Sequence, residues 1–161
     1  YTRFDKVENS WIQVRSRILD LKLAPVDPSE LAGAEKIIAT YGTDEPAPFM
    51  EMVNAFKVKE VLSRNGKPLR AEVQVITIGK DIAFVGLNGE IFVELGMAIK
   101  ESSPYELTVV SSLTNGNVGY VPDHKAFVEG HYEPVSARCA PGSGELLVAA
   151  AVELLHEMYQ D

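Results

Sequence analysis

A short apolar run near the middle of the chain, IAFVGL at 82–87, constrains the fold more than any other feature. The preceding segment, AEVQVITI at 71–78, alternates side chains as a strand does. Gly79-Lys80-Asp81 between the two segments predicts a hairpin. Because 82–87 is apolar throughout, we expect this strand to be central in a sheet and covered on both faces.

Other patterns along the chain alternate between strand and helix. The segment 11–23 is predicted to be a long strand with a bulge near Ile18, because its apolar residues change phase there. A further strand is predicted at 106–113, and helical spacing of apolar residues occurs at 27–42, 49–62, 90–102 and 144–159. The sequence therefore predicts an α/β fold, a mixed sheet with helices packed on it, in one domain over 1–161.

Two helix starts carry local signals. Asp27 is the predicted N-cap of the first helix, with Pro28 at its first position and Glu30 three residues after the cap. Ser143 is the predicted N-cap of the last helix. These residues satisfy backbone N–H groups that have no partner inside a helix.

Composition limits the possible partners. The chain has 161 residues and a net charge of −8, which argues against nucleic acid or an anionic membrane as the main partner. Its one cysteine, Cys139, excludes an internal disulfide framework and a multi-cysteine zinc site. No apolar stretch is long enough for a transmembrane segment. The start, YTRFDKVENS, lacks an initiator Met and a signal-peptide profile, so we expect a piece of a longer protein.

The segment 114–144 is rich in Gly, Pro and Asn and has no strong periodicity, which is typical of a functional loop. It contains His124 and His131, candidate site residues whose roles the sequence leaves open. Neither has a second His or Cys at ligand spacing. His156 falls in the last predicted helix and is expected to be a structural or surface residue, and Cys139 lacks a setting that would make it a nucleophile.

Glu90 is the acid at the joint between the apolar strand and the helix that follows it. One interpretation is structural, because a carboxylate suits the positive N-terminal end of a helix. The other is functional, because active sites in α/β proteins collect where strands end. The residues around Glu90 do not decide between them.

Two stretches, VGLNGEIFVELGMAIKESSP at 85–104 and VVSSLTNGNVGYVPDHKAFVEGHYE at 109–133, resemble the neutral/alkaline, non-lysosomal ceramidase family. The resembling elements occur in order: Asn88-Gly89-Glu90, Asn115, Tyr120 and Tyr132-Glu133. They correspond to the carboxy-terminal part of the catalytic domain of bacterial ceramidase-like proteins. The resemblance covers about residues 70–159, whereas 1–69 match only in general character.

The resemblance implies a zinc-dependent amide hydrolase that cleaves an N-acyl, ceramide-like amide with a metal-activated water. By position, the metal ligands Glu and Tyr of the family fall on Glu90 and Tyr120. A carboxylate is an ordinary zinc ligand, and a phenol can coordinate where the metal's charge lowers its pKa. Asn115 could orient Tyr120 or the loop. The resemblance also implies a role in sphingolipid metabolism and an extracytoplasmic or secreted location.

The sequence departs from the family pattern in two places. Asn88 replaces the usual Pro, and GNVG at 116–119 replaces an aromatic-rich stretch. The second change alters the wall beside the expected metal and leaves open whether ceramide itself is the substrate. The two histidine ligands of the family would come from an amino-terminal segment absent here, so we expect this chain alone to be inactive. The alternative is a non-catalytic ceramidase-like domain that binds a ligand or protein partner through 114–144.

Overall fold

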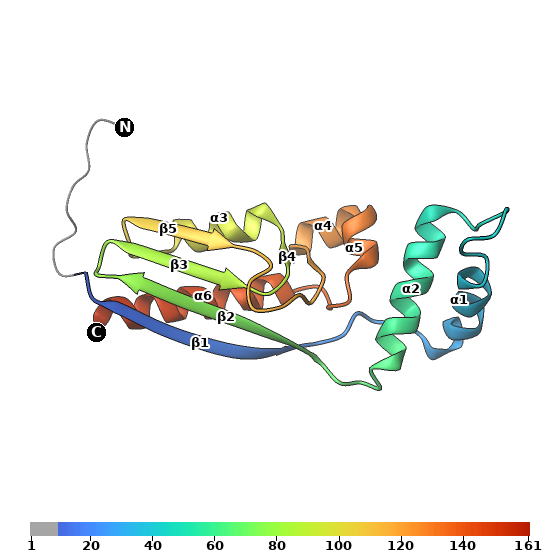
Figure 1. The fold of residues 1–161 in the computed structure, drawn as a ribbon, viewed down its shortest axis with the longest axis horizontal. Helices are drawn as coiled ribbons and strands as arrows, with labels where there is room; N and C mark the ends of the chain where they lie inside the picture. Colours follow the sequence, from blue (N-terminus) through green and yellow to red (C-terminus); the bar gives the residue numbers. More distant parts are fainter. Residues whose placement is uncertain (1–9) are drawn as a thin grey trace, which may run out of the picture.

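The computed structural model describes residues 10–161, which form a sheet, helices along it and a helical hairpin at one end (Figure 1). The strands are β1 (Ile12–Leu21), β2 (Leu69–Ile78), β3 (Ile82–Leu87), β4 (Glu90–Ile91), β5 (Leu107–Ser111) and β6 (Tyr120–Val121). The helices are α1 (Leu31–Ile38), α2 (Phe49–Ser63), α3 (Val93–Glu101), α4 (His124–Glu129), α5 (Tyr132–Ser136) and α6 (Ser143–Gln160). The predicted α/β class, a mixed sheet with packed helices, is confirmed.

The main sheet has the strand order β1-β2-β3-β5. The first three strands are antiparallel, whereas β5 returns parallel to β3 after α3 has crossed over. The predicted hairpin joins β2 to β3 and pairs Ile78 with Ile82. β1 pairs with β2 without interruption, from Ile12 opposite Ile78 to Leu21 opposite Leu69, so the predicted bulge near Ile18 is wrong.

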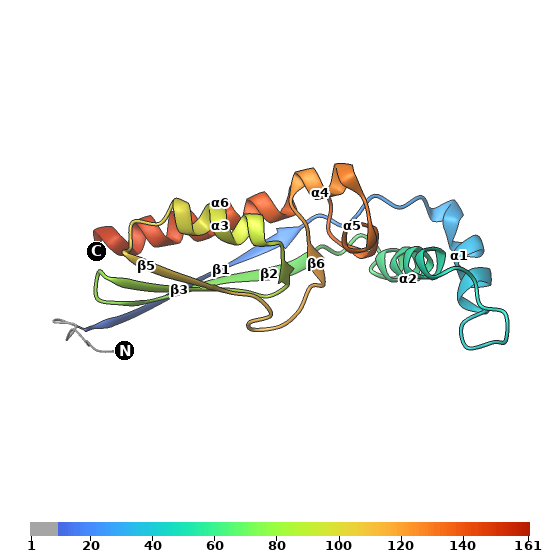
Figure 2. The same cartoon turned by 90° about the horizontal axis from the view of Figure 1, so that it is seen from above.

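The two faces of the main sheet differ in their cover. Figure 2 shows α3 and α6 along one face only. β3 lies between β2 and β5, so its predicted central position is confirmed. The prediction that it is covered on both faces is wrong, because Phe84 at its middle is 40% exposed on the face without helices. We call this face, formed by alternate residues of β1, β2, β3 and β5, the open face.

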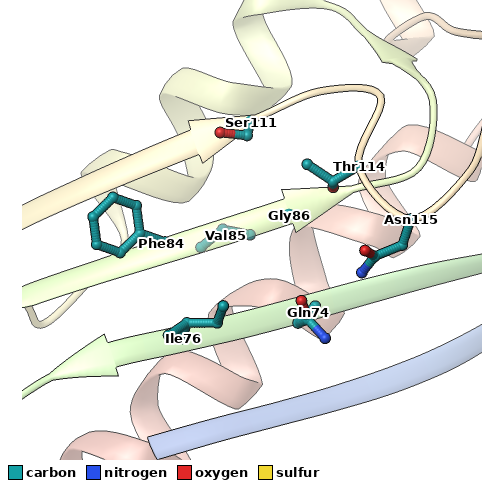
Figure 3. A pocket seen from close by; sticks show the side chains of 8 residues that line it. All are labelled: Gln74, Ile76, Phe84, Val85, Gly86, Ser111, Thr114 and Asn115. Carbon is teal, nitrogen blue, oxygen red and sulfur yellow. The ribbon is translucent and has the colours of Figure 1, made fainter. Parts of the chain in front are cut away.

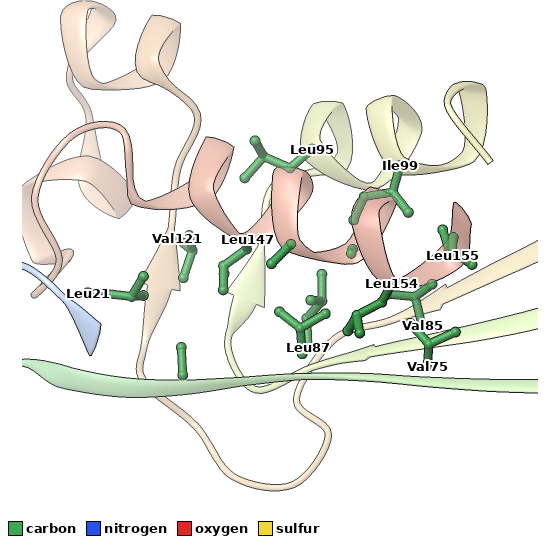
Figure 4. Packing of buried hydrophobic residues seen from close by; sticks show 14 of the residues in the cluster. Leu21, Val75, Val85, Leu87, Leu95, Ile99, Val121, Leu147, Leu154 and Leu155 are labelled. Atoms are coloured by element: carbon green, nitrogen blue, oxygen red, sulfur yellow. The ribbon is translucent and has the colours of Figure 1, made fainter. Parts of the chain in front are cut away.

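The main core lies between the sheet and α3 and α6 (Figure 4). Val75 and Val85 of the central strands are fully buried, as are Leu147 and Leu155 of α6 and Ile99 of α3. Burying a side chain of this size stabilises the fold by about 1.5–3 kcal/mol. This layer fixes β3 and α3, and it therefore fixes the joint between them that contains Glu90.

The helices α1 and α2 form a hairpin beyond the end of the sheet (Figure 1), with a small core of their own around Ala34, Ala55 and Val58. The predicted capping box is confirmed: Asp27 accepts from Ser29 N at 2.8 Å, and Asp27 N donates to Glu30 Oε1 at 2.9 Å. It opens a 3-10 turn, η1 (Pro28–Glu30), that leads into α1.

Several predicted boundaries differ from the structure, among them three in the second half of the chain. The helix predicted at 90–102 begins at Val93, because Glu90 and Ile91 pair with β6 first. The loop predicted at 114–144 contains β6, α4 and α5. Ser143 is the first residue of α6 rather than its N-cap, a position that Gly142 takes in the left-handed conformation at φ 89°.

Candidate functional site

Glu90 and Tyr120 occupy opposite positions on two short parallel strands. β4 and β6 form a separate two-stranded sheet in which Glu90 is the register partner of Tyr120. Glu90 N donates to the carbonyl of Gly119 at 2.9 Å, which fixes this register. Neighbouring strands lie about 4.8 Å apart, and register partners project to the same side. The structure therefore brings together two residues that are 30 positions apart in the sequence.

Glycines allow the two strands to approach each other. A Cβ on Gly89 would lie 3.0 Å from the carbonyl oxygen of Gly119 and 3.0 Å from Cγ2 of Val121. Gly119 has φ 86°, and a Cβ there would lie 2.5 Å from Nη1 of Arg138. The close approach of the two strands therefore depends on glycine at both positions.

The carboxylate of Glu90 changes the acidity of its neighbour. The pKa of Tyr120 is raised above its ordinary value of 10.0, chiefly because the phenol hydrogen-bonds to Glu90. Desolvation and the charges of Glu90, Tyr132 and Glu133 raise it further. The Tyr132-Glu133 pair of the resembling pattern thus acts on Tyr120 electrostatically. A divalent cation between Glu90 and Tyr120 would act in the opposite direction and lower the pKa of the phenol.

Aromatic side chains extend from Tyr120 toward the helical hairpin. The rings of Tyr120 and Tyr132 meet edge to face at 5.7 Å between centroids. Tyr132 in turn stacks on Phe49, the first residue of α2, at 5.6 Å. Phe49 is 67% exposed, so this row of three rings leads from Tyr120 to solvent. Sequence reasoning did not connect Phe49 with the site, because its contact with Tyr132 depends on how α2 meets α5.

The structural interpretation of Glu90 can now be compared with the local geometry. The N-cap of α3 is Phe92, and the acid in its first turn is Glu94. Glu90 lies in β4, two residues before the cap, so the first turn already has its acid without Glu90. The place of a first-turn acid, which the structural interpretation gave to Glu90, is taken by Glu94.

The other polar candidates separate into two groups. His124 begins α4 and His131 precedes α5, and both are exposed. His156 Nε2 lies 3.0 Å from the carbonyl of Ser102, which agrees with the predicted structural role. Cys139 is buried, and its burial raises the pKa of the thiol. A raised pKa opposes thiolate formation at neutral pH, in agreement with the predicted inert role.

A different asparagine from the predicted one holds the backbone before Tyr120. Asn117 Oδ1 accepts from Gly119 N at 2.7 Å. Asn115, which we expected to orient Tyr120 or the loop, lines a pocket on the open face with Gln74 and Thr114 (Figure 3). Asn115 has φ 59°, in the left-handed region, within the segment that joins β5 to β6.

The donor set at the joint is incomplete for zinc. Glu90 and Tyr120 would supply two oxygen ligands, whereas a protein zinc site has three or four protein ligands. Within residues 10–161, no three His, Cys, Asp or Glu side chains converge on a point where they could hold a metal. These two side chains by themselves therefore do not complete a zinc site.

Comparisons with known proteins show a likeness in structure. No family model matches the chain, and no curated protein matches it in sequence. The crystal structure of neutral ceramidase from Pseudomonas aeruginosa aligns with a TM-score of 0.56 and 18% identity, covering 91% of this chain and 29% of that chain. A ceramidase complexed with C2 aligns with a TM-score of 0.53 and 16% identity, covering 91% of this chain and 30% of the other.

These likenesses bear on the fold of the chain. The chain spans less than a third of the length of either ceramidase. No helix in the part that the structure describes is long and apolar enough to cross a membrane. At 16–18% identity the alignment establishes architecture alone, and the chain has a ceramidase-like fold.

Proposed function

We propose that this chain is the carboxy-terminal portion of a zinc-dependent amide hydrolase of neutral ceramidase type, which cleaves an N-acyl, ceramide-like amide. The observation that carries the proposal is the register pairing of Glu90 with Tyr120. These are the two positions at which the resemblance predicts metal ligands. The ceramidase-like fold over 91% of the chain supports it independently of those two residues.

In this proposal the chain supplies half of a metal centre. Glu90 offers a carboxylate oxygen, and Tyr120 offers a phenol oxygen whose O–H hydrogen-bonds to Glu90. Two histidines come from an amino-terminal segment of the same protein, and the chain alone is inactive. Zinc, when bound, supplies a Lewis acid that activates water and polarises the amide carbonyl. The natural setting is extracytoplasmic, with a lipid-like N-acyl amide as substrate.

The experiment uses the longest natural polypeptide that contains this chain. Zinc is measured by elemental analysis and N-acyl amide hydrolysis is assayed in parallel, for the wild type, Glu90→Gln and Tyr120→Phe. We expect about one zinc per chain in the wild type, and a fall of roughly 10-fold or more in metal affinity and activity in each variant. Glu94→Gln, an acid in the first turn of α3, is the matched control and should keep both.

A second function remains a candidate because residues 10–161 do not bring three metal-ligating acid, His or Cys side chains together. In it, the chain is a non-catalytic ceramidase-like domain that binds a ligand or protein partner through residues 114–144. Wild-type natural protein without zinc and without amidase activity would refute the hydrolase and favour this alternative. Zinc that persists in both variants would show that the metal lies elsewhere.

A further inference from the structure

The open face carries two parallel rows of apolar side chains that cross all four strands. One row runs through Val14, Ile76, Phe84 and Val109, and the next through Ile12, Ile78, Ile82 and Leu107. Four strands spaced by about 4.8 Å make each row about 14 Å wide, and the rows lie about 7 Å apart. We call these eight residues the apolar rows.

Several of these side chains are exposed to a degree unusual for aliphatic residues in strands. The exposed fraction is 66% for Ile12, 56% for Val14, 52% for Leu107 and 40% for Phe84. Scattered apolar residues on a surface need no explanation, but a contiguous patch of this kind marks a surface that another molecule covers. A sheet packs against a second layer at about 10 Å through such side chains.

The open face changes character toward the candidate site. The next row contains Ser16, Gln74, Gly86 and Ser111. There the face holds a shallow pocket of about 140 Å³ (Figure 3), and Thr114 Oγ1 is buried beside it without a hydrogen-bond partner. A Cβ on Gly86 would lie 2.7 Å from that oxygen, so glycine allows Thr114 to sit over β3.

Beyond this polar row lie the segments that carry the candidate ligands. β3 ends at Leu87 and is followed by Asn88, Gly89 and Glu90, while the segment after β5 leads through Thr114 to Tyr120. A polypeptide that covers the apolar rows and continues across the polar row would therefore arrive beside Glu90 and Tyr120. In the proposed function, such a polypeptide could carry the missing ligands to this pair.

We infer that the open face is the docking surface for further polypeptide of the same ceramidase-like catalytic unit. The occupant corresponds to the part of the ceramidase chain, about 70% of its length, that this chain does not span. It places an apolar layer on the apolar rows and continues to the candidate site. The identity of the occupant rests on the proposed function. The location of the docking surface rests on the exposed apolar rows of the open face.

Cysteine labelling tests the location. Val14→Cys on the open face and Leu146→Cys on α6, across the helix layer, form a matched pair because both native side chains are 56% exposed. The single native thiol, Cys139, is 1% exposed and contributes little background. Each variant is labelled with a maleimide in the isolated 161-residue chain and in the longest natural gene product that contains it.

In the isolated chain we expect both cysteines to react at similar rates. In the natural gene product, we expect the labelling rate of Val14→Cys to fall at least about tenfold at any protein concentration. The labelling rate of Leu146→Cys should stay the same. Three results would overturn the inference. The first is equal reactivity of both cysteines in the natural gene product. The second is protection of Val14→Cys already in the dilute isolated chain, and the third is protection that rises with protein concentration. The second result would place the cover within these 161 residues, and the third would identify a second copy as the occupant.

The zinc measurement keeps the two proposals separate. Protection of Val14→Cys without zinc would retain the docking surface and refute the hydrolase. Zinc and activity with a reactive Val14→Cys would retain the hydrolase and refute the docking surface.

Discussion

Glu90 and Tyr120 are register partners in a two-stranded parallel sheet that lies outside the main sheet. The pairing places a carboxylate and a phenol side by side on adjacent strands that glycines hold close together. Their relation is chemically informative, because the carboxylate raises the pKa of the phenol. Two oxygen-bearing groups that lie side by side in this way can both bind a cation when one is supplied.

The titration of Tyr120 tests this relation directly. In wild type its phenol should titrate above its ordinary pKa of 10.0, and Glu90→Gln should lower that pKa because the largest cause of the shift is removed. The measurement is a pH titration by NMR with labelled tyrosine rings, with Tyr120→Phe to identify the signal. Glu94→Gln should leave the titration of Tyr120 unchanged. A Tyr120 pKa that does not fall in Glu90→Gln would contradict the pairing.

The raised pKa of Tyr120 also predicts how the stability of the fold depends on pH. Because the folded chain raises the pKa of the phenol, its contribution is fully present below pH 10 and is lost as pH rises through the folded pKa. Thermal melts of wild type and Tyr120→Phe should therefore diverge above pH 10 in one direction only, with wild type losing stability relative to the variant. Parallel curves throughout would show that Tyr120 has the same pKa in the folded and unfolded chain.

Gly119→Ala should destabilise the chain by about 1–3 kcal/mol, because φ is 86° and the added Cβ would meet the guanidinium of Arg138. Urea unfolding measures the change. Gly33→Ala is the control: Gly33 lies in α1 with nothing within 4 Å of the added Cβ, so alanine should stabilise by about 0.5–1 kcal/mol. Equal effects at the two positions would show that residue 119 does not need glycine.

Leu155→Ala should cost about 2–5 kcal/mol, because Leu155 is fully buried between α6 and the sheet. Leu146→Ala on the same helix should change the free energy of unfolding by about 0.5 kcal/mol or less, since Leu146 is 56% exposed. Chemical unfolding of both variants compares the two sides of α6. A large cost at Leu146 would mean that this side is covered in solution.

Acid should weaken the start of the helical hairpin. The pKa of Asp27 is lowered because its carboxylate accepts from Ser29 N, so the stabilisation is present above the unfolded value near 3.8 and is lost as pH falls through the folded pKa. Hydrogen-exchange protection of α1 amides should therefore fall below about pH 4. Asp27→Asn keeps a capping oxygen that does not titrate, so its protection should depend less on pH. Identical profiles would contradict a role for the ionised cap.

Much of the fold could be predicted from the sequence because the signals are local. The β2-β3 hairpin, the start of the first helix at Asp27 and the helix α2 all follow from side-chain period and capping. Predictions that needed the environment of an element were less successful. The apolar run at 82–87 predicted correctly that β3 is central in the sheet, but it did not reveal that helices cover only one face of the strand. Apolar side chains can occur both on a covered face and on an exposed one, so the residue types do not distinguish the two.

The candidate site shows the same division. The residue types at Glu90 and Tyr120, and the glycines beside them, are properties of the sequence, and a resemblance sufficed to single them out. Their pairing, the aromatic contacts of Tyr120 and Tyr132 with Phe49, and the role of Asn117 were decided only in the tertiary structure. The physical reason is that each contact joins elements whose approach is set by the shared core between the sheet, α3 and α6. Local sequence specifies the elements, whereas packing in that core specifies which of their side chains meet.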